Sequence, residues 1–85
     1  MIREEITVRL SGGFETRPIA MLVQLASQFK SEIHLESGTM SVNAKSIMGM
    51  MTLGIDNGED VAILANGEDE AEAVEKIKGY LTHGA

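Results

Sequence analysis

Residues 43–53 read Asn43-Ala44-Lys45-Ser46-Ile47-Met48-Gly49-Met50-Met51-Thr52-Leu53. In this stretch a serine stands directly before a short apolar run, which is the usual position of a helix N-cap. As a cap, the Ser46 hydroxyl accepts a hydrogen bond from a backbone N–H of the first turn, and Met48 and Gly49 are the candidate donors. We therefore predict a short helix that begins after Ser46 and ends near Leu53 and Gly54.

The start of this helix is also a favourable place for a negative charge. Its unpaired N–H groups and the helix dipole both favour an anion, so the backbone would solvate a phosphate on Ser46 without melting the helix. Ile47, Met48 and Met51 add more apolar surface than one short helix needs to bury. One interpretation is a switchable serine inside an apolar patch, and the other is an ordinary capped helix whose methionines fill the core. The pattern alone favours the ordinary helix, because serine caps and core methionines are common.

Length and composition indicate one globular domain over residues 1–85. Hydrophobic residues make up 44% of the chain and charged residues 24%, which suits a chain with a hydrophobic core better than a disordered one. The absence of cysteine excludes disulfides and thiolate chemistry. No apolar run reaches the length of a membrane span and the first residues do not form a signal peptide, so we expect a cytoplasmic protein without membrane contact.

The formal net charge of −6 is unevenly distributed along the chain. Residues 1–55 hold five acidic and five basic side chains, whereas residues 56–85 hold eight acidic side chains against Lys76 and Lys78, so the whole −6 arises there. This balance argues against direct nucleic-acid binding, which requires a basic face. The neutral half is still able to present a local basic spot, and the acidic half is interpreted as a solvated surface.

Apolar periodicity predicts four strands and three helices. Alternation indicates the strands, and spacings of three and four indicate the helices. The expected strands cover residues 5–10, 32–36, 40–42 and 61–65, and the expected helices cover about 16–30, 46–53 and 69–81. Ser37 and Gly38 join the second and third strands as a hairpin. Asp69, with Glu72 three positions later, forms a capping-box pattern for the last helix.

The resulting order is β-α-β-β-α-β-α, and each expected strand has one apolar face. We therefore expect an α+β fold, an open-faced β-sandwich in which three helices cover one face of a four-stranded antiparallel sheet and leave the other face wet. The expected core consists of Ile6, Val8, Leu22, Ala26, Phe29, Ile33, Leu35, Val42, Val61, Ile63, Val74, Ile77 and Leu81.

Catalytic and metal-binding patterns are scarce in this chain. His34 and His83 share no metal-ligand spacing with a carboxylate cluster, so no metal site is expected. The sequence has no P-loop, no dinucleotide-binding glycine pattern and no nucleophile elbow, and we expect neither a cofactor nor an enzyme. Arg17 stands at a helix start, where the dipole already favours an anion. Its position is equally compatible with a phosphate contact and with a solvated arginine.

Two segments and their spacing resemble the HPr family, the small phosphocarrier proteins of the bacterial sugar phosphotransferase system. The first segment reads Gly13-Phe14-Glu15-Thr16-Arg17-Pro18, and the second reads Val42-Asn43-Ala44-Lys45-Ser46-Ile47-Met48-Gly49, followed by Leu53-Gly54. The resemblance runs over all 85 residues and extends to the Gly-Glu-Asp-Glu start of the last helix. It implies the HPr fold.

The first segment departs from the family pattern at Glu15. Phosphocarriers of this family have a histidine at this position, and its imidazole carries the phosphoryl group. A carboxylate does not replace that imidazole as a reversible carrier, and its negative charge repels an incoming phosphoryl donor. Ile19 is a lesser departure, because the family usually has alanine there. The resemblance therefore implies that the sugar-transport relay is lost while the regulatory serine is kept.

This combination resembles the catabolite-repression HPr-like (Crh) branch, whose members have glutamine where this chain has Glu15. The resemblance implies that a bifunctional HPr kinase/phosphorylase phosphorylates Ser46 with ATP. It also implies that the phosphorylated protein binds a LacI-type repressor, similar to catabolite control protein A, and so regulates transcription in carbon catabolite repression. The residues implied in phosphate or partner contact are Arg17, Lys45, Ile47, Met48 and Met51.

Two alternatives stay open at the level of sequence. One is a phosphocarrier with an atypical active site, for which Glu15 and His34 are the only candidate carriers. The other is an interaction module that acts without phosphorylation, such as a ferredoxin-like scaffold that shares part of the element order. The closing third helix and the serine segment count against this module. The sequence is also compatible with a homodimer.

Overall fold

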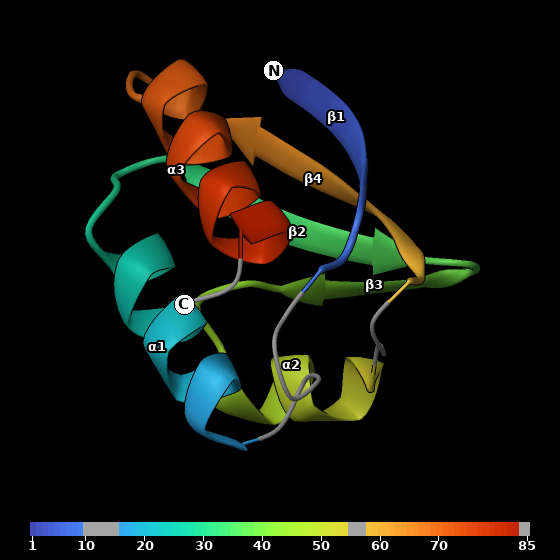
Figure 1. Cartoon of the computed structure of the whole chain (residues 1–85). Coiled ribbons are helices and arrows are strands. Elements are labelled where there is room, and N and C mark those ends of the chain that lie inside the picture. The colour runs from blue at the N-terminus through green and yellow to red at the C-terminus, as the bar shows by residue number, and fades with distance from the viewer. Residues whose placement is uncertain (10–15, 55–57, 84–85) are drawn as a thin grey trace.

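The structure is a computed structural model that describes residues 1–9, 16–54 and 58–83, of which residues 16–18 and 83 are described by their backbone alone. Its elements are β1 (Ile2–Thr7), α1 (Thr16–Ser27), β2 (Glu32–Ser37), β3 (Met40–Asn43), α2 (Ile47–Leu53), β4 (Asp60–Asn66) and α3 (Glu70–His83). The predicted order β-α-β-β-α-β-α is confirmed (Figure 1). Within the described ranges, no helix is long and apolar enough to cross a membrane.

The four strands form one antiparallel sheet in the order β1-β4-β2-β3, so β1 and β3 are its edge strands. The pairs Ile6–Val61 and Leu35–Ile63 align the alternating apolar residues on one face of this sheet. The helices pack over that face, and none of the described helices covers the opposite one (Figure 1). The predicted open-faced α+β architecture is therefore confirmed.

Residues from the sheet and all three helices meet in one hydrophobic core. Every residue predicted for the core is buried there except Val42, which is half-buried and packs against it. The prediction missed Met50 and Leu53, the two residues of α2 that are buried. A seven-residue helix has only two turns, which is too short for a spacing pattern to show which of its apolar residues face inward.

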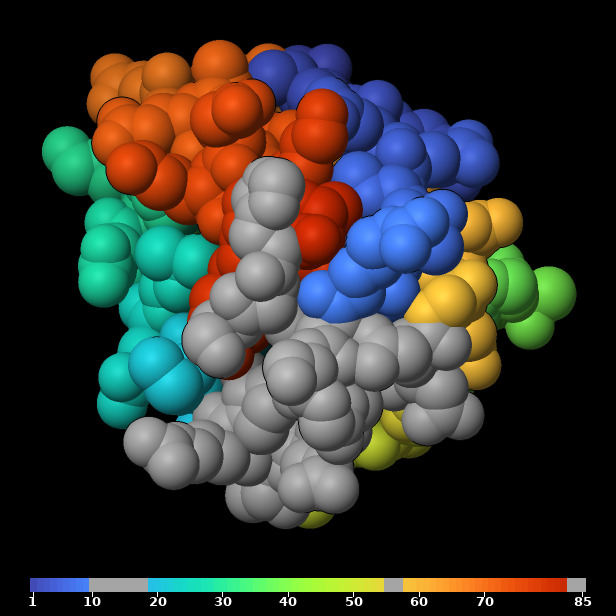
Figure 2. Space-filling view, in the orientation of Figure 1, coloured from blue at the N-terminus to red at the C-terminus, as the bar shows by residue number. Residues whose placement is uncertain are grey.

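The first strand lies earlier in the chain than predicted. It covers Ile2–Thr7 instead of residues 5–10, and Leu10 lies outside the described residues. Glu4 lies on the helix-covered face together with Ile6. Because Glu4 is polar, it interrupts the apolar alternation from which the start of the strand was predicted. There its carboxylate is 2.5 Å from Lys78 Nζ of α3, and Figure 2 shows β1 (blue) lying against α3 (orange to red). The Glu4–Lys78 ion pair therefore joins β1 to α3 at the edge of the core, where an apolar contact would be the usual arrangement.

The first helix ends at Ser27, three residues before the predicted end. The N–H groups of Gln28 and Phe29 donate to the carbonyls three residues earlier, each at 3.2 Å, so the last turn is tightened. This turn still directs the Phe29 side chain into the core, where it is 9% exposed. The apolar spacing therefore continues past the end of the α-helix itself.

The predicted Asp69–Glu72 capping box is wrong, because the acids at the start of α3 have other partners. The Glu70 carboxylate accepts a hydrogen bond from the Gly67 N–H at 3.1 Å, which places the reciprocal contact two residues earlier. The Asp69 carboxylate instead accepts from the backbone N–H groups of Lys30 and Ser31, at 2.8 and 3.0 Å. Asp69 therefore ties the start of α3 to the connection between α1 and β2.

Candidate functional site

The candidate site lies at the N-terminus of α2. Ser46 has an extended backbone (φ −110°, ψ 117°), and its Oγ accepts a hydrogen bond from the Gly49 N–H at 3.1 Å. The Ser46 carbonyl accepts from the Met50 N–H at 3.0 Å, which starts the helical ladder. The predicted cap is confirmed, with Gly49 as the donor. At the other end, Gly54 closes the helix in the left-handed region at φ 58°.

Gly49 lies where α2 approaches the neighbouring strand β3. A Cβ at this position would be 3.4 Å from the Cβ of Val42 on β3 and 3.5 Å from Ser46 Oγ. A side chain larger than that of alanine would therefore either push the helix away from β3 or crowd the serine hydroxyl. The glycine keeps the surroundings of Ser46 Oγ open on the helix side.

The remaining apolar residues of α2 point away from the core. Ile47 is 46% exposed, Met48 is 77% exposed and Met51 is 49% exposed, whereas Met50 is fully buried. We call Ile47, Met48 and Met51 the α2 patch. One methionine therefore fills the core, and the α2 patch forms an exposed apolar surface beside Ser46. That Ser46 is switchable stays a prediction.

Lys45 precedes the serine, and its ammonium reaches to another element. Lys45 Nζ donates to the carbonyl of Phe29 at 2.7 Å, just past the end of α1. The Lys45 N–H donates to Asn43 Oδ1 at 2.8 Å, which fixes the turn that leads into α2. A cation is favourable at a helix C-terminus, because the last carbonyls there lack intrahelical partners. In this structure Lys45 therefore joins the start of α2 to the end of α1.

Two other predicted site residues lie at the start of α1. Glu15 is outside the described residues, and Arg17 is described by its backbone only, in the first turn of α1. The helices α1 and α2 pack against each other. The contacts predicted for the Arg17 side chain and the position of the Glu15 carboxylate thus lie outside the described part of the chain.

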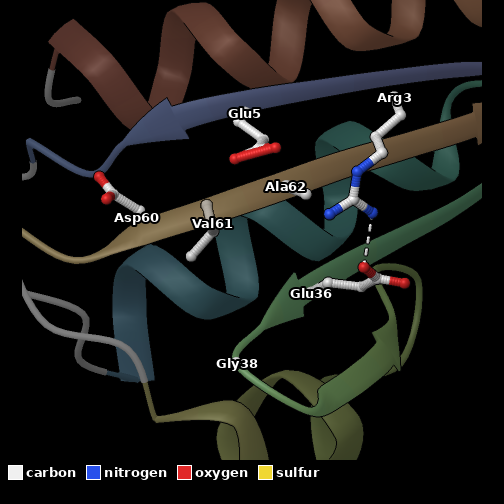
Figure 3. Close-up of a pocket in the computed structure, with 7 residues that line it drawn as sticks. All are labelled: Arg3, Glu5, Glu36, Gly38, Asp60, Val61 and Ala62. Atoms are coloured by element: carbon white, nitrogen blue, oxygen red, sulfur yellow. Dashed lines mark hydrogen bonds and ion pairs between the residues drawn. The ribbon is translucent and has the colours of Figure 1, made fainter.

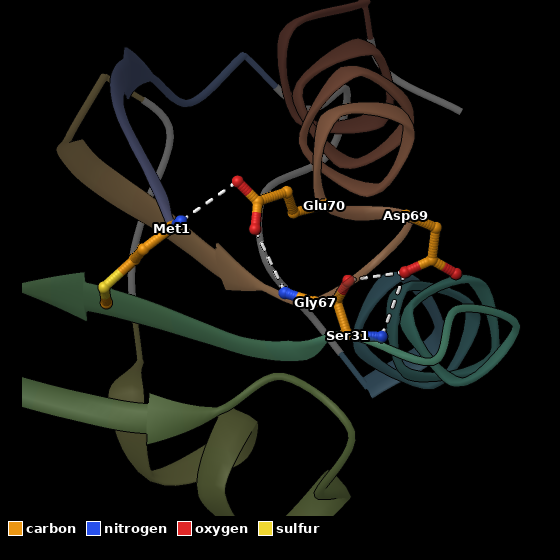
Figure 4. A network of polar contacts seen from close by, with 5 residues as sticks. All are labelled: Met1, Ser31, Gly67, Asp69 and Glu70. Atoms are coloured by element: carbon orange, nitrogen blue, oxygen red, sulfur yellow. Dashed lines mark hydrogen bonds and ion pairs between the residues drawn. The ribbon is translucent and has the colours of Figure 1, made fainter.

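A polar network that the sequence did not reveal joins the α1–β2 connection to α3 (Figure 4). Ser31 is 1% exposed, and its Oγ donates to the Asp69 carboxylate at 2.5 Å. The hydrogen bonds from Ser31 and Lys30 lower the pKa of Asp69 to about 2. A Cβ on Gly67 would be 2.6 Å from Ser31 Cα, so this position requires glycine. The close packing and the paired carboxylate suit a structural role for this network.

The open face of the sheet carries a second group of charged residues. Arg3 on β1 and Glu36 on β2 point toward each other across Ala62 of β4, with 2.6 Å between Arg3 Nη1 and Glu36 Oε1 (Figure 3). The ion pair raises the pKa of Arg3. Glu5 and the Asp60 carboxylate lie in the same shallow hollow (Figure 3). In the described part of the chain, no three histidines or acids come together in a way that could hold a metal ion.

The comparison with protein families agrees with the fold. Residues 2–83 match the family described as the PTS HPr component phosphorylation site. The chain belongs to the HPr family. This match confirms, at the level of the family, the resemblance found in the sequence. HPr proteins are phosphocarriers.

Individual HPr relatives support a more specific likeness. The chain is 46% identical over 81 residues to the HPr-like protein Crh of Bacillus subtilis (strain 168), covering 95% of each chain. Its structure resembles the phosphocarrier protein HPr of Bacillus anthracis strain Ames with a TM-score of 0.92 and 38% identity, covering 95% of this chain and 96% of the other. It also resembles a crystal structure of Bacillus subtilis Crh, described as an intertwined dimer with a swapping domain. That match has a TM-score of 0.76 and 46% identity, and it covers 95% of this chain and 93% of the other.

Proposed function

We propose that this HPr-like chain is a regulatory phosphoprotein of one domain, residues 1–85, that acts in carbon catabolite repression. HPr kinase/phosphorylase phosphorylates Ser46, and the phosphorylated protein then binds a LacI-type repressor in the cytoplasm as a corepressor. It is not an enzyme and does not carry phosphoryl groups on a histidine. The observation that carries this proposal is the half-buried Ser46 at the start of α2, directly beside the exposed α2 patch.

The geometry at Ser46 is compatible with phosphorylation of the folded protein. The hydroxyl lies where the Gly49 N–H already donates to it, so that donor can also serve a phosphate oxygen. A phosphoserine carries about −1.5 to −2 charges and would compete with the Phe29 carbonyl for the Lys45 ammonium. We expect the fold to be kept and a partner to meet a phosphate next to an apolar surface.

Intact mass measurement tests the kinase step. The protein is incubated with HPr kinase/phosphorylase and ATP, and we expect the mass of one phosphoryl group to be added. Ser46→Ala is the matched variant and should gain no mass. A phosphoryl group on Ser46→Ala, or none on the wild-type protein, would contradict the proposal.

Repressor binding tests the second step. We expect the affinity for the LacI-type repressor to rise on phosphorylation and to fall with added salt, because a cationic side chain of the repressor would pair with the phosphate. Ser46→Asp should imitate the phosphate poorly, since a carboxylate has less charge and fewer acceptor atoms. If Ser46→Ala and the phosphorylated protein bound the repressor equally well, the serine would be only a helix cap.

The loss of the phosphocarrier relay is tested separately. Glu15 stands at the family's phosphohistidine position, so the chain should accept no phosphate from phosphoenolpyruvate through Enzyme I, the usual donor of the family. Acid-labile labelled phosphate on this protein would favour the alternative of an atypical phosphocarrier. Glu15→His tests whether the rest of this segment still supports transfer.

The proposal extends to a homodimer, because the related Crh structure is described as an intertwined dimer with a swapping domain. In this chain β1 is an edge strand that pairs with β4 alone among the described strands, so an exchanged copy could replace it without disturbing β2 or β3. Sedimentation at several protein concentrations should show a dimer that dissociates on dilution. A monomer at every concentration would contradict this part of the proposal.

A further inference from the structure

The methionines of α2 differ sharply in exposure although they are close in sequence. Met48 is 77% exposed and Met51 is 49% exposed, whereas Met50 between them is fully buried. Met48 and Met51 are three positions apart, so they lie on the same side of the helix. Ile47, the third residue of the α2 patch, has no atom that a mild oxidant attacks. The patch therefore combines apolar contact area with two accessible thioethers.

We propose that Met48 and Met51 are reversible oxidation sites whose sulfoxides switch off the docking surface that phosphorylation of Ser46 switches on. The docking part of this inference rests on the proposed function. The oxidant is a hydroperoxide, with hydrogen peroxide as the simplest case. The thioether sulfur attacks the outer peroxide oxygen, an S–O bond forms as the O–O bond breaks, and the sulfur is oxidised by two electrons. The peroxide is reduced to water, or to an alcohol when it is organic.

The difference in burial makes the oxidation selective among the methionines of α2. A hydroperoxide reaches Met48 and Met51 in the folded protein, because both side chains face solvent. It reaches Met50 only when α2 opens away from the core, and such openings are rare where a side chain is fully packed. Among the three methionines of α2, we therefore expect Met48 to react first, Met51 next, and Met50 more than about tenfold more slowly than Met48, while the exposed Met1, Met21 and Met40 outside the α2 patch also react.

Oxidation at these two positions should change the surface and leave the fold intact. Neither side chain belongs to the hydrophobic core, and the Met48 contact within the helix is made by its carbonyl, which accepts from Thr52 Oγ1 at 2.8 Å. A sulfoxide is polar and accepts hydrogen bonds, so burying it against an apolar partner surface leaves an unsatisfied acceptor. The affinity of the patch for such a partner should therefore fall while the melting temperature stays unchanged.

Mass mapping decides whether these residues are oxidation sites. The folded protein is treated with hydrogen peroxide, and tandem mass spectrometry follows the gain of one oxygen at each methionine with time. Methionine sulfoxide reductase should then remove the oxygen from Met48 and Met51 in the folded protein. Equal oxidation rates for Met48 and Met50 would overturn the selectivity, and a reductase that leaves both sulfoxides in place would overturn the reversibility.

Repressor binding decides whether oxidation acts on docking. The phosphorylated protein should lose at least about tenfold in affinity after peroxide treatment and regain it with the reductase. The double variant Met48→Leu/Met51→Leu keeps apolar area of similar volume, so it should bind the repressor and stay insensitive to peroxide. The matched control Met21→Leu/Met40→Leu removes methionines that are 45% and 41% exposed on α1 and β3, and it should stay sensitive.

The outcomes separate this inference from the proposed function. A phosphorylated, unoxidised protein that fails to bind the repressor overturns the proposed function and with it the docking part of the inference, and the mass mapping still decides the oxidation sites. If the unoxidised protein binds and the oxidised protein binds equally well, the proposed function stands and the oxidation switch is wrong. Peroxide sensitivity that persists in Met48→Leu/Met51→Leu would place the effect outside the α2 patch.

Discussion

At the scale of single residues, Ser46 has one observed role and one proposed role, and substitutions can separate them. Its Oγ caps α2 through the Gly49 N–H, and the same atom is the proposed phosphoacceptor. Alanine removes both the acceptor and the nucleophile. Aspartate keeps a good helix cap and removes only the hydroxyl. The contribution of the cap to stability can therefore be measured apart from any effect of phosphorylation.

The first prediction concerns this cap. Ser46→Ala should lower the free energy of unfolding by about 1 kcal/mol, because the Gly49 N–H loses its acceptor. Ser46→Asp should stay within about 0.5 kcal/mol of the wild-type protein, since Asp and Ser are comparable caps. Urea denaturation of the three unphosphorylated proteins checks this. An alanine variant as stable as the wild type would mean that the hydrogen bond from the Gly49 N–H to Ser46 Oγ does not contribute to the free energy of unfolding.

The second prediction concerns the pH dependence of the Asp69 contacts. The hydrogen bonds from Ser31 and Lys30 hold the pKa of Asp69 at about 2, below its ordinary value of 3.8. A carboxyl whose pKa is lowered by folding stabilises the protein fully above its ordinary pKa, and that stabilisation is lost as the pH falls through the folded value. The melting temperature of the wild-type protein should therefore fall between about pH 4 and about pH 2.

Asp69→Asn removes this titration and is the informative variant. Its melting temperature should be lower than that of the wild type at pH 7, and the difference should shrink toward pH 2. Glu72→Gln is the matched control, because Glu72 is an exposed acid of the same helix. It should retain the pH dependence of the wild type. A constant difference between Asp69→Asn and wild type across this range would contradict the assignment.

At the scale of elements, α2 is held by contacts from several directions. Met50 and Leu53 anchor it in the core, Gly49 lies next to Val42 of β3, and Lys45 joins its start to the end of α1. The orientation of the helix decides which side chains form the α2 patch. The packing of Met50 and Leu53 in the core thus determines that Ile47, Met48 and Met51 are the residues exposed to solvent.

The third prediction concerns the fit of α2 on β3. Gly49→Ala should raise the free energy of unfolding by up to about 1 kcal/mol, because alanine is the better helix former and its Cβ would stand at an ordinary contact distance of 3.4 Å from Val42 Cβ. Gly54→Ala is the control with the opposite sign, since φ 58° strains any side chain. Chemical denaturation of both variants checks this. A destabilising Gly49→Ala would show that α2 lies closer to β3 than the structure has it.

At the scale of the whole molecule, the two faces of the β-sheet differ in character. The helix-covered face of the sheet is sealed by apolar residues, and the open face carries polar and charged side chains such as those of Arg3 and Glu36. The α2 patch lies on the solvent side of α2, whose buried residues Met50 and Leu53 belong to the core between sheet and helices. Loss of core packing should therefore destabilise the whole fold, while substitutions at exposed positions should have little effect.

The fourth prediction tests this core. Leu22 is fully buried on α1, and Leu22→Ala should cost on the order of 2–5 kcal/mol of unfolding free energy through lost burial and the cavity left behind. Gln24→Ala changes an exposed residue of the same helix and should cost less than about 0.5 kcal/mol. The two variants are compared by thermal and urea unfolding. A loss well below 1 kcal/mol for Leu22→Ala would mean that this face of α1 does not meet the core.

The sequence by itself determined the order of the elements, the main core residues and the helix cap at Ser46. These features depend on neighbours within a few positions, through the apolar spacing of a helix or strand and the preference of serine for a helix start. The family likeness came from two short segments, residues 13–18 and 42–49, and from the spacing between them.

The tertiary structure alone decided which methionines of α2 face solvent and where Asp69 and Lys45 find their partners. Asp69 and Ser31 are 38 positions apart in the sequence, and Lys45 and Phe29 are 16 positions apart. No periodic pattern of a helix or strand predicts contacts at such separations. Met50 turns inward because α2 packs between α1 and β3, a rotation that two helical turns do not encode. These features depend on how distant elements pack together, because packing sets both the rotation of a short helix and the reach of each polar side chain.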